Sequence, residues 1–118
     1  MDLTGEWKNQ LGSVVTLTQV EDGKLEGTYQ TEVSSKGDPL PPTPLHGSYQ
    51  ITENGVLFGF VCQWNFQKDN EVKYSSTAWS GRGMKENPNE LKATWLLTSG
   101  NEPDWKSVNI NQDVFTRV

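Results

Sequence analysis

The chain has 118 residues, a formal net charge of −5 and hydrophobic residues at only 33% of its positions. This length suits a single domain covering residues 1–118 and leaves little room for a second. Its Lys and Arg residues form no basic stripe, so we expect no nucleic-acid partner, and no apolar run reaches the roughly 18 residues that a membrane span needs. The single cysteine excludes an intrachain disulfide, and 5 Trp, 4 Phe and 3 Tyr predict a core of large aromatic rings.

The first half of the chain consists of short extended runs separated by turn residues. Residues 3–8, 13–20 and 24–31 are predicted strands, and Asp22-Gly23 marks a tight hairpin between the second and the third. The connection over residues 34–44 holds four of the six prolines. Because proline lacks the N–H that a sheet ladder uses, we expect a stiff loop there, rather than a strand or a linker between two domains.

The second half continues the same pattern. Predicted strands cover residues 45–52, 56–66, 74–84, 90–99 and about 106–116, with turns at Asn54-Gly55, "KENPN" and "SGNEPD". Eight sequential strands with mostly short connections predict an all-β fold, an eight-stranded antiparallel up-and-down β-barrel, because closure removes exposed strand edges. A β-sandwich is the alternative, although its two sheets usually carry more aliphatic inward faces.

Residues able to carry out a reaction are sparse. His46 is the single histidine and stands beside a turn, and Cys62 lies among aromatic residues where an inert buried thiol is expected. Glu86 and Glu90 are close in sequence but flank an exposed proline-containing turn, and no nucleophile motif, phosphate loop or zinc motif occurs. We therefore expect a binding protein, not an enzyme, with no metal and no cofactor.

Rows of polar residues with tryptophan are the distinctive feature of the predicted strands. In "SSTAWSG", Ser75, Thr77 and Trp79 share one face, because successive side chains of a strand point to opposite sides. A second row pairs Tyr29 with Thr31, and a third places Asn109, Asn111 and Asp113 on one face of the last strand. Such rows are typical of polar faces turned to water, but if they converge they would form a small-molecule pocket with aromatic walls.

Six segments occur in the order and spacing typical of one family: "LTGEWKNQLGSVVTL", "GTY", "GFVCQWNF", "SSTAWSG", "TWLLTSG" and "DWKS…QDVFTR". Together they cover nearly the whole chain, and it resembles the avidin and streptavidin family of biotin-binding proteins. The resemblance implies a streptavidin-like barrel with biotin bound in its open end and a secreted or periplasmic location. The connection over residues 34–44 departs from the family pattern.

The resemblance also implies the contacts to biotin. Asn9, Ser13 and Tyr29 match the donors to the ureido oxygen, whereas Thr31 and Asp113 match the acceptors for the two ureido N–H groups. Thr77 matches the hydroxyl beside the thioether sulfur, and Ser75 matches a contact to the valerate carboxylate. Ser34 and Ser35 are further candidates to hydrogen-bond that carboxylate. Aromatic and apolar wall positions are matched by Trp64, Trp79, Trp95, Phe66, Leu11, Val33 and Leu97.

Trp105 carries an inference of its own. In the family, the tryptophan of this "WK" motif reaches into the site of a neighbouring subunit, so the resemblance implies a homotetramer. If Asp113 faces the ligand, then Val108, Ile110 and Val114 face outward, and an exposed apolar row of this kind marks an interface. The alternative for Trp105 is a loop aromatic packed on its own barrel.

Trp7 is expected to have a structural role. In barrels that begin with G-x-W, the tryptophan usually fills the closed end, and Arg117 on the last strand is placed to stack over it.

Two other binding functions remain open from the residues themselves. A lipocalin-like carrier of an apolar ligand fits G-x-W, but the chain is short and its predicted lumen holds many hydrogen-bonding groups. A tryptophan-rich carbohydrate-binding module fits the aromatic content, but sugar platforms are usually flat and exposed.

Overall fold

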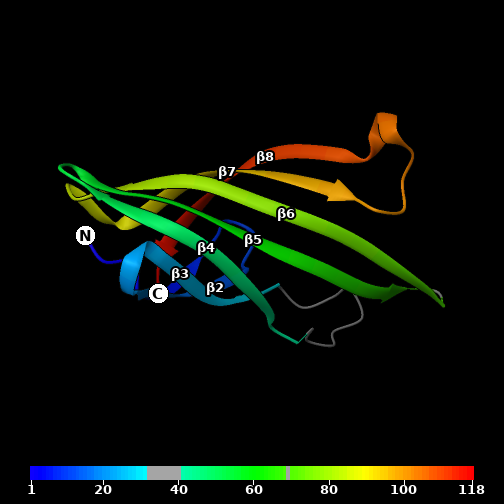
Figure 1. Cartoon of the computed structure of the whole chain (residues 1–118), viewed down its shortest axis with the longest axis horizontal. Helices are drawn as coiled ribbons and strands as arrows, with labels where there is room; N and C mark the ends of the chain where they lie inside the picture. Colours follow the sequence, from blue (N-terminus) through cyan, green and yellow to red (C-terminus); the bar gives the residue numbers. More distant parts are fainter. Residues whose placement is uncertain (32–40, 69) are drawn as a thin grey trace.

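Eight antiparallel strands close into a barrel in a computed structural model that describes residues 1–31, 41–68 and 70–118 (Figure 1). The strands are β1 (Gly5–Lys8), β2 (Val14–Val20), β3 (Lys24–Gln30), β4 (Thr43–Thr52), β5 (Gly55–Lys68), β6 (Glu71–Met84), β7 (Asn87–Ser99) and β8 (Val108–Arg117). Each strand pairs with its neighbours in sequence, and β8 returns to β1 through Trp7–Arg117 and Lys8–Thr116. The predicted up-and-down barrel is confirmed, and the β-sandwich is not formed.

Two short helical turns interrupt the strands. The first, η1 (Glu21–Gly23), forms the β2–β3 hairpin at the predicted Asp22-Gly23 pair, where both residues adopt positive φ. The second, η2 (Asp104–Lys106), lies between β7 and β8 at the opposite end of the molecule from the two chain termini (Figure 1). Neither of these turns, nor any other part of the described chain, supplies a helix long and apolar enough to cross a membrane.

Three strands begin two or three residues before their predicted positions: β4, β6 (at Glu71 instead of Tyr74) and β7. The errors at β4 and β7 involve proline. β7 begins at Asn87 instead of Glu90, so the turn before it consists only of Lys85 and Glu86. Pro88 lies just after the Met84–Asn87 pair, where the register between β6 and β7 shifts. β4 begins at Thr43, so Pro44 lies in a strand. Because pairing with β5 starts only at Leu45, Pro44 is paired on its β3 side alone, and a strand end of this kind tolerates proline.

The core fills the end of the barrel at which the termini lie. Trp7 is fully buried and donates its indole N–H to the carbonyl oxygen of Leu3 at 2.8 Å. The guanidinium of Arg117 stacks over the Trp7 ring at 4.1 Å and donates to the carbonyl oxygens of Thr4 and Asp2. The predicted cation–π contact at this end of the barrel is confirmed.

Aromatic rings carry the core toward the open end. Phe58 stacks with Phe60 at a centroid distance of 6.1 Å, and Phe60 stacks with Trp79 at 4.7 Å. Trp79 therefore packs against the core on one side and forms the floor of the open half of the barrel on the other.

Candidate functional site

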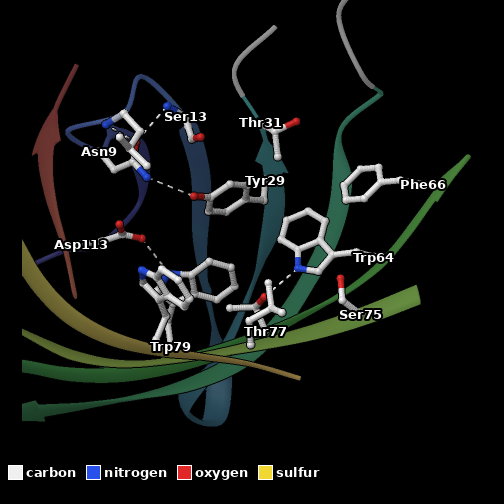
Figure 2. A pocket seen from close by; sticks show the side chains of 13 residues that line it. Asn9, Ser13, Tyr29, Thr31, Trp64, Phe66, Ser75, Thr77, Trp79 and Asp113 are labelled. Atoms are coloured by element: carbon white, nitrogen blue, oxygen red, sulfur yellow. Dashed lines mark hydrogen bonds between the residues drawn. The ribbon is translucent and has the colours of Figure 1, made fainter. Parts of the chain in front are cut away.

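A cavity of about 240 Å³ occupies the open half of the barrel (Figure 2). Its walls come from β3, from β5 to β8 and from the β1–β2 connection. The lining residues are Asn9, Leu11, Ser13, Tyr29, Thr31, Trp64, Phe66, Ser75, Thr77, Trp79, Trp95, Leu97 and Asp113.

Strand alternation places these side chains inside. On β6, Ser75, Thr77 and Trp79 follow one another at every second position, so all three point to one face. The pairing sets Ser75 opposite Trp64 of β5 and Trp79 opposite Trp95 of β7. The row of Ser75, Thr77 and Trp79 thus forms one wall of a cavity instead of packing in a filled core.

Asn9 organises the polar end of the cavity. Its side-chain oxygen accepts from the backbone N–H groups of Leu11 and Ser13 at 3.0 and 2.9 Å, which holds the β1–β2 connection in a compact turn. Its amide nitrogen donates to the Tyr29 hydroxyl at 3.2 Å (Figure 2). Because that nitrogen carries two hydrogens, one N–H is left for a further acceptor.

Tyr29 is held as a neutral hydrogen-bond donor. Its ring stacks on Trp79 at 5.0 Å and meets the edge of Trp64 at 5.4 Å. Burial raises the pKa of Tyr29 to about 12, the nearby negative charge of Asp113 acts in the same direction, and a hydrogen bond with Ser13 partly opposes both. Since its oxygen already accepts from Asn9, the phenolic proton is available to donate.

Thr77 is oriented by a neighbouring indole. The Trp64 indole N–H donates to the Thr77 hydroxyl oxygen at 2.8 Å, and both residues are buried. Because the oxygen accepts this bond, the hydroxyl proton is free to point toward a ligand.

Asp113 supplies an acceptor on the same side of the cavity as Asn9 (Figure 2). Its side chain is 3% exposed, and one carboxylate oxygen accepts the Trp79 indole N–H at 3.0 Å. The other oxygen accepts the side-chain N–H of Gln10 at 3.0 Å. A buried carboxylate held by two donors is a charge-assisted acceptor for any N–H that a ligand brings.

Comparison of the sequence with known proteins identifies one family. The model of the Avidin family matches residues 1–118. The chain belongs to the avidin family. It is similar to avidin from Gallus gallus, with 34% identity over 122 residues that cover 98% of this chain and 78% of that protein. It is also similar to avidin-related proteins 4/5 and 6 of Gallus gallus, each 34% identical over 98% of this chain and 77% of the relative.

The avidin-family residues predicted from the sequence come together in space. Every predicted site residue that the structure describes lines the cavity except Trp105. Val33, Ser34 and Ser35 lie outside the described residues. The role of each lining residue in binding stays a prediction.

Trp105 lies away from the cavity of its own barrel. It belongs to η2, and its side chain is 83% exposed, with the Lys106 ammonium 5.3 Å from the ring. The alternative that Trp105 packs on its own barrel is therefore wrong. A tryptophan this exposed is available to another molecule.

The third predicted row converges only in part. Asp113 enters the cavity, whereas Asn109 and Asn111 are exposed. β1 pairs with β8 only at Arg117 and Thr116, so this part of β8 has a paired strand on its β7 side alone. Val108, Ile110 and Val114 are exposed on the outer face, as predicted.

The sequence did not indicate Gln10, which contacts the site through Asp113 without lining the cavity. It follows Asn9 in the first motif, but it lies in a connection where strand alternation does not set side-chain direction. The signal available was its place between two predicted donors, Asn9 and Ser13.

Proposed function

We propose that this protein binds biotin non-covalently in the open end of the barrel and catalyses no reaction. The observation that carries the proposal is the placement of hydrogen-bond donors at one end of an aromatic cavity with a buried carboxylate beside them. A ligand that fits must present an acceptor oxygen close to an N–H group on a compact apolar body. The ureido ring of biotin has this pattern.

The donor set suits the ureido oxygen. Asn9 offers an N–H and Tyr29 a phenolic O–H, and both lie beside Ser13, whose side chain is buried. These donors are oriented before a ligand arrives, and hydrogen bonds are stronger in such a low-dielectric site than in water. Asp113, and Thr31 nearer the mouth, would accept from the two ureido N–H groups.

The remaining walls suit the rest of biotin. Trp64, Trp79 and Trp95 would enclose the fused rings, while the Thr77 hydroxyl would donate to the thioether sulfur. Phe66, stacked on Trp64 at 5.7 Å, and Ser75 stand nearer the mouth, where the valerate chain and its carboxylate would leave the barrel. Leu11 and Leu97 add apolar surface at the rim.

The proposal includes a homotetramer in which Trp105 covers the cavity of a neighbouring subunit. Two features support it: the 83% exposure of Trp105, and the exposed apolar side chains of Ile110 and Val114 on β8. Exposed apolar side chains that share one face of a strand are typical of an interface. A secreted or periplasmic location stays a prediction from the family resemblance.

The decisive experiment is a titration of the purified protein with biotin, followed by tryptophan fluorescence. Because three indoles line the cavity, we expect a change in emission that saturates at one biotin per chain, together with retention on biotin-agarose. Desthiobiotin serves as a competitor that keeps the ureido ring and lacks the sulfur.

The result that overturns the proposal is an unchanged emission spectrum together with free passage through biotin-agarose. A response to a long-chain fatty acid or to an oligosaccharide, with none to biotin, would instead identify a lipocalin-like carrier or a carbohydrate-binding module.

A further inference from the structure

Gln10 makes three hydrogen bonds with β8 around the buried carboxylate. Its side-chain oxygen accepts the backbone N–H of Val114 at 3.0 Å. Its side-chain nitrogen donates to the carbonyl oxygen of Gln112 at 3.2 Å and to the Asp113 carboxylate at 3.0 Å. The residues on both sides of Asp113, and Asp113 itself, are therefore held by one side chain.

These contacts lie at the seam where the barrel closes. Backbone pairing between β1 and β8 consists of two residue pairs, the last of which along β1 is Lys8–Thr116. Beyond this point β1 gives way to the connection that contains Gln10. A carboxamide carries one carbonyl and an N–H, as a peptide unit does. The side chain of Gln10 thus takes the place of the strand neighbour that β8 lacks there.

The same contacts orient the carboxylate. The Trp79 indole holds one oxygen of Asp113 and Gln10 holds the other, so the carboxylate has donors on both sides and little freedom to rotate. Each oxygen can accept a second bond, which leaves capacity for a ligand N–H. Gln10 does not line the cavity, and any effect on a ligand must pass through Asp113 or through the adjoining Asn9.

We propose that Gln10 is a positioning residue that sets the orientation of Asp113 toward the ligand and couples it to the donors of the β1–β2 connection. Asn9 and Gln10 are consecutive, so one short segment sets both the donors and the acceptor. The distance between the oxygen and the N–H that a ligand must present is then determined by this segment. This role in ligand selection rests on the proposed binding of biotin, whereas the orientation of Asp113 does not.

The first test is a double-mutant cycle on the rate of biotin release. If Gln10 acts through Asp113, Gln10→Ala speeds release by roughly 10- to 100-fold in the native background, the range expected for a hydrogen bond to a charged group. In the Asp113→Ala background the same change has an effect of less than about 3-fold, because the coupled partner is already gone. Equal effects in both backgrounds overturn the proposal.

Gln10→Glu separates the two functions of the side chain. The new carboxylate keeps an acceptor for the Val114 N–H but replaces the donor to Asp113 with a negative charge. We expect release at neutral pH at least as fast as in Gln10→Ala. Release at the wild-type rate would show that Gln10 only anchors the backbone. Gln50→Ala, an exposed glutamine on β4, is the matched control and should leave release unchanged.

A ligand-free measurement keeps the proposal testable if biotin does not bind. The Trp79 indole N–H donates to the same carboxylate, so its ¹H–¹⁵N resonance, assigned with Trp79→Phe, reports the orientation of Asp113. Gln10→Ala and Gln10→Glu should shift this resonance, and Gln50→Ala should not. An unmoved resonance in both Gln10 variants overturns the positioning role, whereas wild-type protein that ignores biotin overturns only the proposed function and its part in ligand selection.

Discussion

Thr77→Val removes one hydroxyl from the wall of the cavity while keeping the branched shape of the side chain. In the native protein this hydroxyl oxygen accepts the Trp64 indole N–H at 2.8 Å, and the two residues are 3% and 7% exposed. Water therefore has little access to the N–H once its acceptor is gone. The variant thus tests the cost of one unpaired buried donor without a large cavity.

The magnitude follows from that unpaired donor. Leaving a buried N–H without a partner costs about 1–3 kcal/mol of unfolding free energy. This cost is present with and without ligand, so it cancels in the affinity. Only the bond from the hydroxyl to the ligand is lost on binding, at about 0.5–1.5 kcal/mol, which corresponds to roughly 2- to 12-fold weaker biotin binding.

Urea unfolding without ligand measures the first quantity, and the rate of biotin release measures the second. Protein concentration is held constant, because assembly makes apparent stability depend on it. Thr18→Val is the matched control, since Thr18 is exposed on β2 and does not line the cavity, and its substitution should change neither quantity. Unfolding free energies for Thr77→Val and wild type that agree within about 0.5 kcal/mol would refute the reasoning.

Three further predictions address the closed end, the buried acids and the exposed tryptophan. Arg117→Met keeps the aliphatic stem but removes the cation from the Trp7 ring. We expect urea unfolding to show a free energy of unfolding lower by about 1–2 kcal/mol, with the rate of biotin release unchanged. Faster release would contradict a purely structural role. Burial raises the pKa of Cys62 from 9.0 to about 12 and that of Tyr29 from 10.0 to about 12. Because the folded protein keeps both groups protonated, their contribution to stability is complete below the ordinary pKa values and is lost at higher pH. The free energy of unfolding should therefore fall as pH rises from about 9 to about 12. Cys62→Val should flatten the decline between about pH 9 and 10, and an identical pH profile would show that Cys62 does not contribute. Trp105→Lys should speed biotin release by at least about 10-fold and lower the mass measured by light scattering, whereas full retention of affinity would exclude the intersubunit role.

Much of the barrel could be predicted because its causes are local. Strand alternation requires only that every second residue share an environment, and "SSTAWSG" shows this pattern within seven letters. Turn pairs such as Asp22-Gly23 mark hairpins through backbone geometry alone. The errors at Pro44 and Pro88 arose because proline excludes a ladder N–H, while the register decided whether that N–H was needed.

The sequence alone determined which residues share a face of each strand. Its motifs indicated the family and the chemistry expected of Asn9, Tyr29 and Asp113. It did not determine that Asn109 stays in solvent while Asp113, on the same strand face, is buried. That difference depends on where β1 ends relative to β8, which is a property of the closed barrel. Gln10 illustrates the same point, because its partners lie 102–104 residues away and only closure brings them within hydrogen-bond distance.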